Sequence, residues 1–154
     1  MIRNIRHAVP AVAVLLMASV VSSIAGEYFE KDGTAIGGYD PVAYFTDMKP
    51  VKGLQEFPAE YQGSTFYFSS AANRDRFAAN PAKFVPQYGG YCAFGMAKGY
   101  KAAIDPGAFT VVGDKRYLNY NGTVRALWVL DIQGYVKKAD QNWPELRTSS
   151  QIIH

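Results

Sequence analysis

Cys92 and Met96 are the two residues whose types and spacing point most directly to chemistry. The segment from Tyr91 to Lys98 is predicted to be helical, and a spacing of four places both sulfur atoms on one face of such a helix. A thiolate together with a thioether is a soft donor pair that suits a copper(I) ion. The same pair is also typical of a packed core, because free cysteine is among the most buried residue types and methionine fills gaps between apolar side chains.

The residues just before Cys92 indicate a second kind of site. Gly89 and Gly90 allow the backbone to turn sharply and to be approached closely. A helix that starts near Cys92 would lower the pKa of its thiol and would favour a reactive thiolate or a bound anion. The sequence therefore fits a redox or ligand site here as well as a metal site.

Tyrosine is unusually frequent in this chain, with 11 copies. Tyr39, Tyr88 and Tyr91 are predicted to bind a ligand, because a cluster of tyrosines can line a cleft. A tyrosine hydroxyl also needs a partner when its ring is buried, so the same residues could equally form a hydrogen-bonded core.

Most catalytic chemistry is excluded by the residue types that the chain lacks. Its two histidines are His7 and His154, near the two ends of the sequence, and it has one cysteine. This composition rules out an intrachain disulfide and a cysteine-rich zinc site, and it leaves Ser69 and Ser70 without a histidine to activate them. No pair of acidic residues has a spacing that indicates a carboxylate-dependent hydrolase. The chain is therefore predicted not to be an enzyme.

Residues 1–25 are predicted to be a secretory signal peptide. Arg3 and Arg6 precede an apolar run from Ala8 to Val21, and small residues stand before a predicted cleavage after Ala25. The mature protein is expected in the periplasm or the medium, with no transmembrane anchor after cleavage. Without the leader, which holds two arginines and no acidic residue, the charges nearly balance, which argues against a nucleic-acid partner.

The rest of the sequence predicts short elements separated by Gly, Pro, Asn and Asp. Two hairpins are expected, one joining 56–61 to 65–69 and the other joining 109–112 to 116–119. Helices are expected at 42–45, 71–79, 81–84 and 91–98, and a last helix capped by Thr123 carries apolar residues at helical spacing: Val124, Trp128, Ile132, Tyr135 and Ala139. The predicted fold is α+β, a small single domain of short helices with two β-hairpins over 26–147, followed by a flexible tail at 148–154.

Several stretches of the sequence resemble the YHS domain. They are TFYFSS at 65–70, NRDRF at 73–77 and NPAKF at 80–84, and GYDPVAYF at 38–45 and GGYCA at 89–93 are similar to the exported, stand-alone branch of that family. The resemblance covers roughly 34–146 and implies a YHS-like fold with a metal-binding role. The family's metal-handling members carry cysteines where this chain has Ser69 and the stretch 71–73, so the resemblance does not transfer the metal ligands.

Three hypotheses follow from these observations. The first is an exported, non-catalytic YHS-type module that binds a soft metal ion such as copper, or a small ligand, near Cys92. The second is a structural or interaction module that docks on a protein of the cell envelope and holds no metal. The third, an enzyme that uses the Cys92 thiol, is the weakest because the nucleophile would lack a base.

Overall fold

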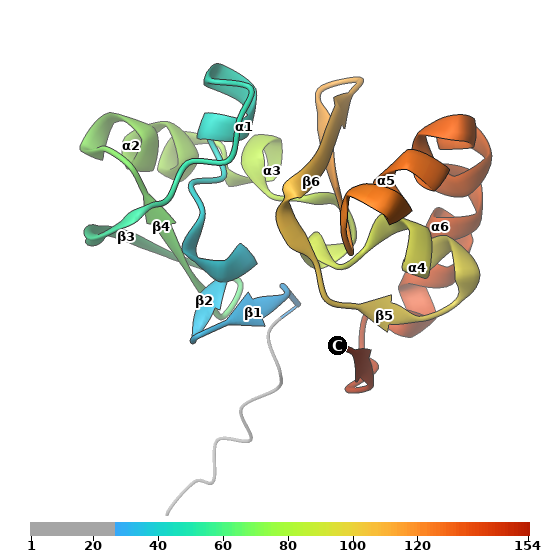
Figure 1. Cartoon of the computed structure of the whole chain (residues 1–154). Coiled ribbons are helices and arrows are strands. Elements are labelled where there is room, and N and C mark those ends of the chain that lie inside the picture. Colours follow the sequence, from blue (N-terminus) through green and yellow to red (C-terminus); the bar gives the residue numbers. More distant parts are fainter. Residues whose placement is uncertain (1–26) are drawn as a thin grey trace, which may run out of the picture.

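The computed structural model describes residues 27–154, so the predicted signal peptide lies outside the described part. Helices and short strand pairs are mixed along the chain, which confirms the predicted α+β class. The elements form two halves that lie side by side (Figure 1). Both predicted hairpins are present, one in each half.

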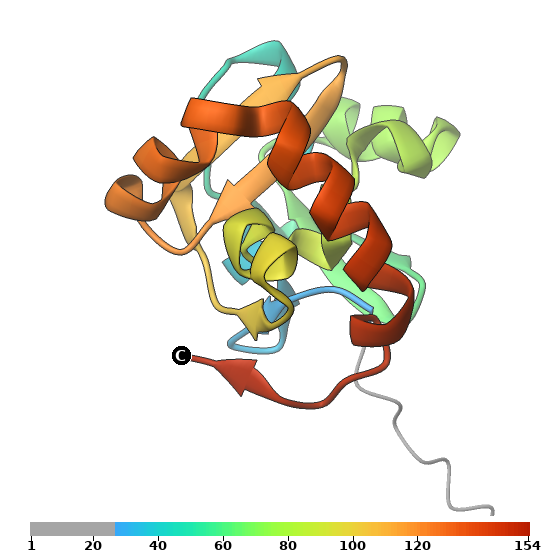
Figure 2. The same cartoon turned by 90° about the vertical axis from the view of Figure 1, so that its right-hand side faces the viewer.

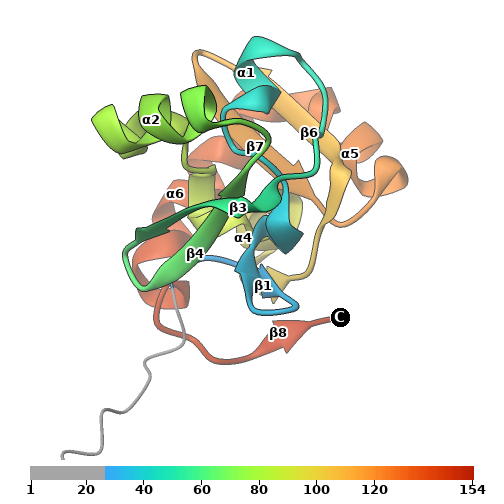
Figure 3. The same ribbon diagram turned by 90° about the vertical axis from the view of Figure 1, so that its left-hand side faces the viewer.

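The N-terminal half holds the first hairpin and the helices that follow it. Its elements are β1 (Glu30–Lys31), β2 (Thr34–Ala35), the 3₁₀ turn η1 (Ile36–Gly38), α1 (Ala43–Thr46), β3 (Leu54–Tyr61), β4 (Ser64–Phe68), α2 (Ala71–Ala79) and α3 (Pro81–Phe84). The 3₁₀ turn η2 (Gln87–Gly90) then leads into the C-terminal half, where it packs against β7 and α4. The helix α2 has the predicted bounds because the Ser70 hydroxyl accepts the Asn73 N–H at its start, while Pro81 opens the next helix. Figure 3 shows α2 and the β3–β4 hairpin from this side.

The side chain of Asp40 connects α1 with the junction between β4 and α2 through hydrogen bonds. Its Oδ1 accepts the N–H groups of Val42 (2.8 Å) and Ala43 (3.3 Å) at the start of α1. Its Oδ2 accepts the Ser69 N–H (2.9 Å), the Ser69 hydroxyl (2.7 Å) and the Asn73 Nδ2–H (2.8 Å). This buried carboxylate therefore satisfies five donors from two separate segments.

The C-terminal half packs helices against the second hairpin. Its elements are α4 (Ala93–Lys98), β5 (Lys101–Ala102), β6 (Asp105–Val112), β7 (Lys115–Asn119), α5 (Gly122–Trp128), the 3₁₀ turn η3 (Val129–Asp131), α6 (Ile132–Leu146) and β8 (Ile152–Ile153). Figure 2 shows α6 running diagonally beside α4 and the chain end returning toward β5. No helix within residues 27–154 combines the length and the apolar character that a bilayer crossing requires.

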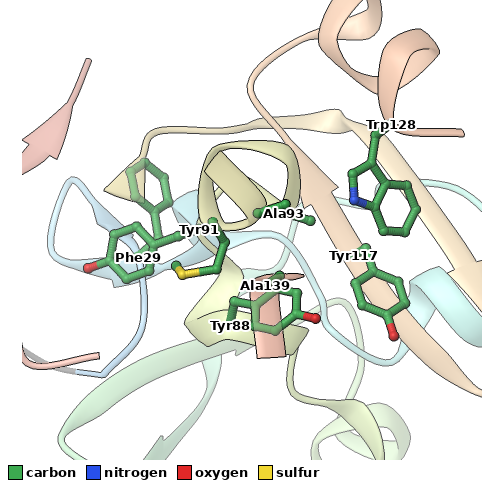
Figure 4. Close-up of a cluster of buried hydrophobic side chains, with 9 residues drawn as sticks. Phe29, Tyr88, Tyr91, Ala93, Tyr117, Trp128 and Ala139 are labelled. Carbon is green, nitrogen blue, oxygen red and sulfur yellow. The ribbon is translucent and has the colours of Figure 1, made fainter. Parts of the chain in front are cut away.

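Each half has its own core, and a third small cluster joins them. Aromatic rings of the N-terminal half gather around Phe77, which lies 5.2 Å from the Phe66 ring and 5.0 Å from the Phe68 ring. The core of the C-terminal half is built around Trp128 and Tyr117 (Figure 4). Between the two halves, Ile36, Tyr44 and Leu118 form the joining cluster.

The last predicted helix is two helices in the structure. Asn121, not Thr123, caps α5 by accepting the Val124 N–H. The chain then passes through η3, and Asp131 caps α6 by accepting the Gly134 N–H (2.9 Å). The apolar spacing continues across this break, which is why periodicity alone predicted one helix.

The segment 148–154, predicted as a flexible tail, carries a strand. Ile152 and Ile153 pair in parallel with Lys101 and Ala102. The Lys101 Nζ reinforces this return by donating to the carbonyls of Arg147 (3.0 Å) and Ser149 (2.8 Å). The local sequence does not predict this strand, because the strand depends on pairing with residues about fifty positions earlier.

Candidate functional site

The helix α4 positions Cys92 and Met96. It begins at Ala93, with Cys92 as its cap, and ends at Lys98, where Gly99 with a φ of 93° forms the C-terminal cap. The Cys92 Sγ accepts the Gly95 N–H at 3.4 Å. Although the helix starts later than predicted, the Met96 N–H still bonds to the Cys92 carbonyl (2.8 Å), so the expected spacing of one turn is present.

Both sulfur-bearing side chains lie inside the C-terminal half. Cys92 is 2% exposed and Met96 is fully buried. Asn119 of β7 faces the thiol, with its Oδ1 3.7 Å from Sγ, and Asn142 of α6 donates to the Met96 carbonyl (2.9 Å). These contacts favour the interpretation of Cys92 and Met96 as core residues, because neither sulfur has access to solvent or to an incoming ion.

The environment of the thiol also disfavours its ionisation. Burial raises the pKa of Cys92 above its usual value, and this effect outweighs the N–H groups of Gly95, Tyr120 and Phe94, which lower it. The expected lowering by the helix start is thus wrong in its net direction. Since a metal-binding cysteine must lose its proton, the raised pKa works against a copper thiolate at neutral pH.

We predict that the Cys92 thiol of the native protein resists a disulfide reagent such as dithionitrobenzoate. Burial and protonation both block the reaction, so labelling should become complete only in denaturant. The measurement is absorbance of the released thiolate, with and without guanidinium chloride. Fast stoichiometric labelling of the folded protein would show that the thiol is accessible.

Two of the three predicted ligand-binding tyrosines lie in the core. The Tyr88 hydroxyl donates to the Asp140 Oδ1 (2.8 Å), and burial followed by this hydrogen bond raises the pKa of Tyr88. Tyr91 packs edge-on against Phe29, with ring centroids 5.8 Å apart (Figure 4). These two tyrosines therefore match the alternative of a hydrogen-bonded aromatic core, and neither is exposed to bind a ligand in the structure as it stands.

The third tyrosine, Tyr39, lines a cavity of about 170 Å³ where the two halves meet. The Lys52 Nζ lies 4.6 Å from the centre of the Tyr39 ring and donates to the Gly37 carbonyl (2.8 Å). Apolar and charged side chains share the wall of this cavity, here named the Tyr39 cavity: Phe29, Lys31, Asp32, Ile36, Gly37, Tyr39, Lys52, Ile104 and Pro106.

The backbone at this cavity is strained. Ile36 has a φ of 48° and is fully buried, although β-branched residues strongly avoid this left-handed region. Such a conformation typically costs about 1–3 kcal/mol and concentrates at binding and active sites. Ile36 is held there because its N–H bonds to the Phe29 carbonyl (2.8 Å) and its side chain fills the cluster with Tyr44 and Leu118.

Sequence reasoning missed the partners of Tyr39. Lys31 lies in β1, Ile36 in η1 and Lys52 in the connection before β3, and nothing in their local sequence marks them as neighbours. The one available signal was the glycine pair at 37–38, which indicates a turn beside Tyr39.

The residues that match the family's metal ligands have other roles here. The Ser69 hydroxyl donates to Asp40, and within the stretch 71–73 the Asn73 side chain donates to the same carboxylate. Within the described residues, no group of three or more His, Cys, Asp or Glu side chains could hold a metal ion. The donors that the structure describes over 27–154 therefore do not fit the cysteine-based metal centre that the resemblance implies.

Comparison with known families gives one match. Residues 42–88 match the YHS domain, a span that runs from α1 through the β3–β4 hairpin to η2. No curated protein and no solved structure matches the chain significantly.

Proposed function

This chain is a YHS domain-containing protein, and from that premise we propose that it is an exported, non-catalytic binding module whose ligand is a small anion held in the Tyr39 cavity. The observation that carries the proposal is the buried, left-handed Ile36 at the wall of a cavity that also presents lysine side chains. A strained backbone conformation persists only where the surrounding contacts hold it in place, and such residues are frequent at ligand-binding sites.

The charges of the cavity support an anionic ligand. The cavity wall includes two cationic side chains, Lys31 and Lys52, and one acidic side chain, Asp32. The ammonium group of a lysine has three donors, and only one from Lys52 is used, on the Gly37 carbonyl. The cavity is smaller than the 300–1,000 Å³ typical of drug-sized ligands, which limits the ligand to a few heavy atoms.

Export is the second part of the proposal. It is supported by the basic start, the short apolar run and the small residues of 1–25. If it is correct, intact-mass analysis of protein from the producing cells should give a chain that begins at Gly26, whereas an intact Met1 would contradict it.

We expect sodium acetate to bind in the Tyr39 cavity, because a carboxylate fits both its size and its charge. Amide chemical shifts followed by NMR during titration should move at Gly37, Tyr39 and Lys52, and acetamide, the neutral analogue, should leave them unchanged. The variant Lys52→Gln should weaken acetate binding about threefold or more. Lys138→Gln, on an exposed part of α6, is the matched control.

Two results would contradict this assignment. One is the absence of acetate-dependent shifts around Tyr39 at millimolar concentration. The other is equal binding by acetate and acetamide, which would remove the role of the lysines.

A second candidate function, docking on a protein of the cell envelope, is favoured by one surface. Leu127 at the end of α5 and Val129 and Leu130 in η3 are exposed within four positions of the sequence, and Leu130 is 79% exposed. Contiguous exposed apolar residues are typical of interaction sites. An envelope complex that is lost in Leu130→Asp and kept in Lys52→Gln would support this function over the first.

A further inference from the structure

A second and larger depression lies where the N-terminal half faces the tip of the β6–β7 hairpin. Its volume is about 700 Å³, within the range of small-molecule sites. It is bounded by α1, by the end of α2 together with α3, and by the hairpin strands, whose arrangement can be followed in Figures 1 and 3. We call it the hairpin groove, and it is distinct from the Tyr39 cavity because no residue lines both.

One part of the hairpin groove is apolar. Phe45 and Phe84 pack edge-on with ring centroids 5.9 Å apart, and Val111 lines the groove from the hairpin. Met48 lies at the rim and is 59% exposed. These side chains offer an apolar surface on which a short alkyl chain or an aromatic ring of a ligand can pack.

The other part of the groove is positively charged. Arg76 and Lys83 contribute two cations, and Asp114 is the only acid in the lining. Within residues 27–154 neither cation takes part in an ion pair. The simplest alternative is a solvated basic face, but here both cations border an apolar wall, and Lys83 Nζ lies 5.6 Å from the centre of the Phe84 ring.

A third cation lies behind the apolar wall. The Arg116 guanidinium is buried, donates to the carbonyls of Pro41 (2.8 Å) and Phe84 (3.1 Å), and lies 5.7 Å from the centre of the Phe45 ring. Its Nε–H has no acceptor in the described part of the chain. Burial lowers the pKa of Arg116 to about 10, which leaves the side chain charged at neutral pH.

The charge of Arg116 is only partly compensated. The negative charge of the buried Asp40 favours the charged form of Arg116. Within residues 27–154, however, the two side chains form no ion pair, and the oxygens of Asp40 accept hydrogen bonds from other donors. A buried charge is screened less than an exposed one, so Arg116 adds to the attraction that Arg76 and Lys83 exert on an anion in the groove.

We infer that the hairpin groove binds an organic anion in which a carboxylate is attached to an apolar body. The carboxylate would lie toward Arg76 and Lys83, and the apolar body would pack on Phe45, Phe84 and Val111. This inference is independent of the Tyr39 cavity, which is too small for such a ligand and has its own charges.

The test uses three probes that separate charge from apolar contact. Octanoate carries both features, 1-octanol carries only the apolar body, and acetate carries only the charge. Titrations followed by NMR should show octanoate binding most tightly, with shifts at Phe84 and Val111. Raising the salt concentration should weaken octanoate binding and leave that of octanol unchanged.

Variants then assign the cations. Arg76→Gln and Lys83→Gln should each raise the Kd for octanoate about threefold, and the double variant about tenfold, with octanol unaffected. Lys138→Gln should leave the Kd unchanged. Equal binding of octanoate and octanol, or octanoate shifts confined to Gly37 and Tyr39, would overturn the inference, as would no binding at millimolar probe. Because Arg76 and Lys83 are exposed, these variants are expected to fold.

Discussion

Replacing Asp40 by alanine is expected to destabilise the protein by about 3 kcal/mol or more, because five donors would lose their acceptor together. Those donors lie on both α1 and the β4–α2 junction, so the loss would separate two segments. Arg116 would also lose the acid that stabilises its buried charge. Equilibrium unfolding in urea measures the change.

Asp40→Asn makes the prediction more specific. An amide retains one acceptor oxygen, but it places N–H groups where the other carboxylate oxygen accepts, so neither orientation of the amide satisfies all five donors. We therefore expect a loss close to that of the alanine variant. Asp75→Asn is the control, since the Asp75 side chain is 71% exposed and its change should lie within about 0.5 kcal/mol. An Asp40→Asn protein as stable as wild type would contradict the role of this carboxylate.

Trp128→Ala is expected to cost about 3–5 kcal/mol, a large part of the 5–15 kcal/mol that stabilises a small domain. The indole is fully buried and lies against Tyr117 with ring centroids 4.9 Å apart. The variant should yield little soluble protein, or a strongly lowered Tm by circular dichroism.

Two further variants separate the contributions of Trp128. Its Nε1–H has no acceptor within the described residues, so Trp128→Phe loses ring area but no hydrogen bond and should cost clearly less than alanine. Leu130→Ala, two positions along and 79% exposed, should leave the Tm nearly unchanged. A Trp128→Ala protein with a normal Tm would show that the residue is not part of the core.

The elements with local signals were predictable from the sequence. The first hairpin follows from its alternating and aromatic strands around Gln62–Ser64, and the second from the turn residues Gly113-Asp114. The helix α2 follows from a serine cap, which is Ser70 in the structure, and from the Asn80-Pro81 stop. Each of these signals lies within a few residues of the structure that it specifies, so no long-range contact is needed to interpret it.

The features that were missed depend on distant partners. The strand β8 forms because Lys101 and Ala102 lie beside it. The break before α6 depends on the cap by Asp131, and the sequence does not reveal it because the apolar residues keep their helical spacing across the break. The same limit applies to the site. The spacing of Cys92 and Met96 was correct, but their burial under Asn119 and Asn142 comes from β7 and α6. Tyr39 meets Lys52 only because these two residues form an isolated antiparallel bridge between segments that are distant in the sequence.

The proposed function rests on one distinction, which is whether this protein holds a small organic anion outside its sulfur-containing core or a metal ion on Cys92. Native mass spectrometry of the protein purified from its own cells tests it most directly. We expect an adduct with the mass of an anion of a few heavy atoms, which is kept in Cys92→Ser and clearly reduced in Lys52→Gln. A copper adduct that disappears in Cys92→Ser and persists in Lys52→Gln would contradict it.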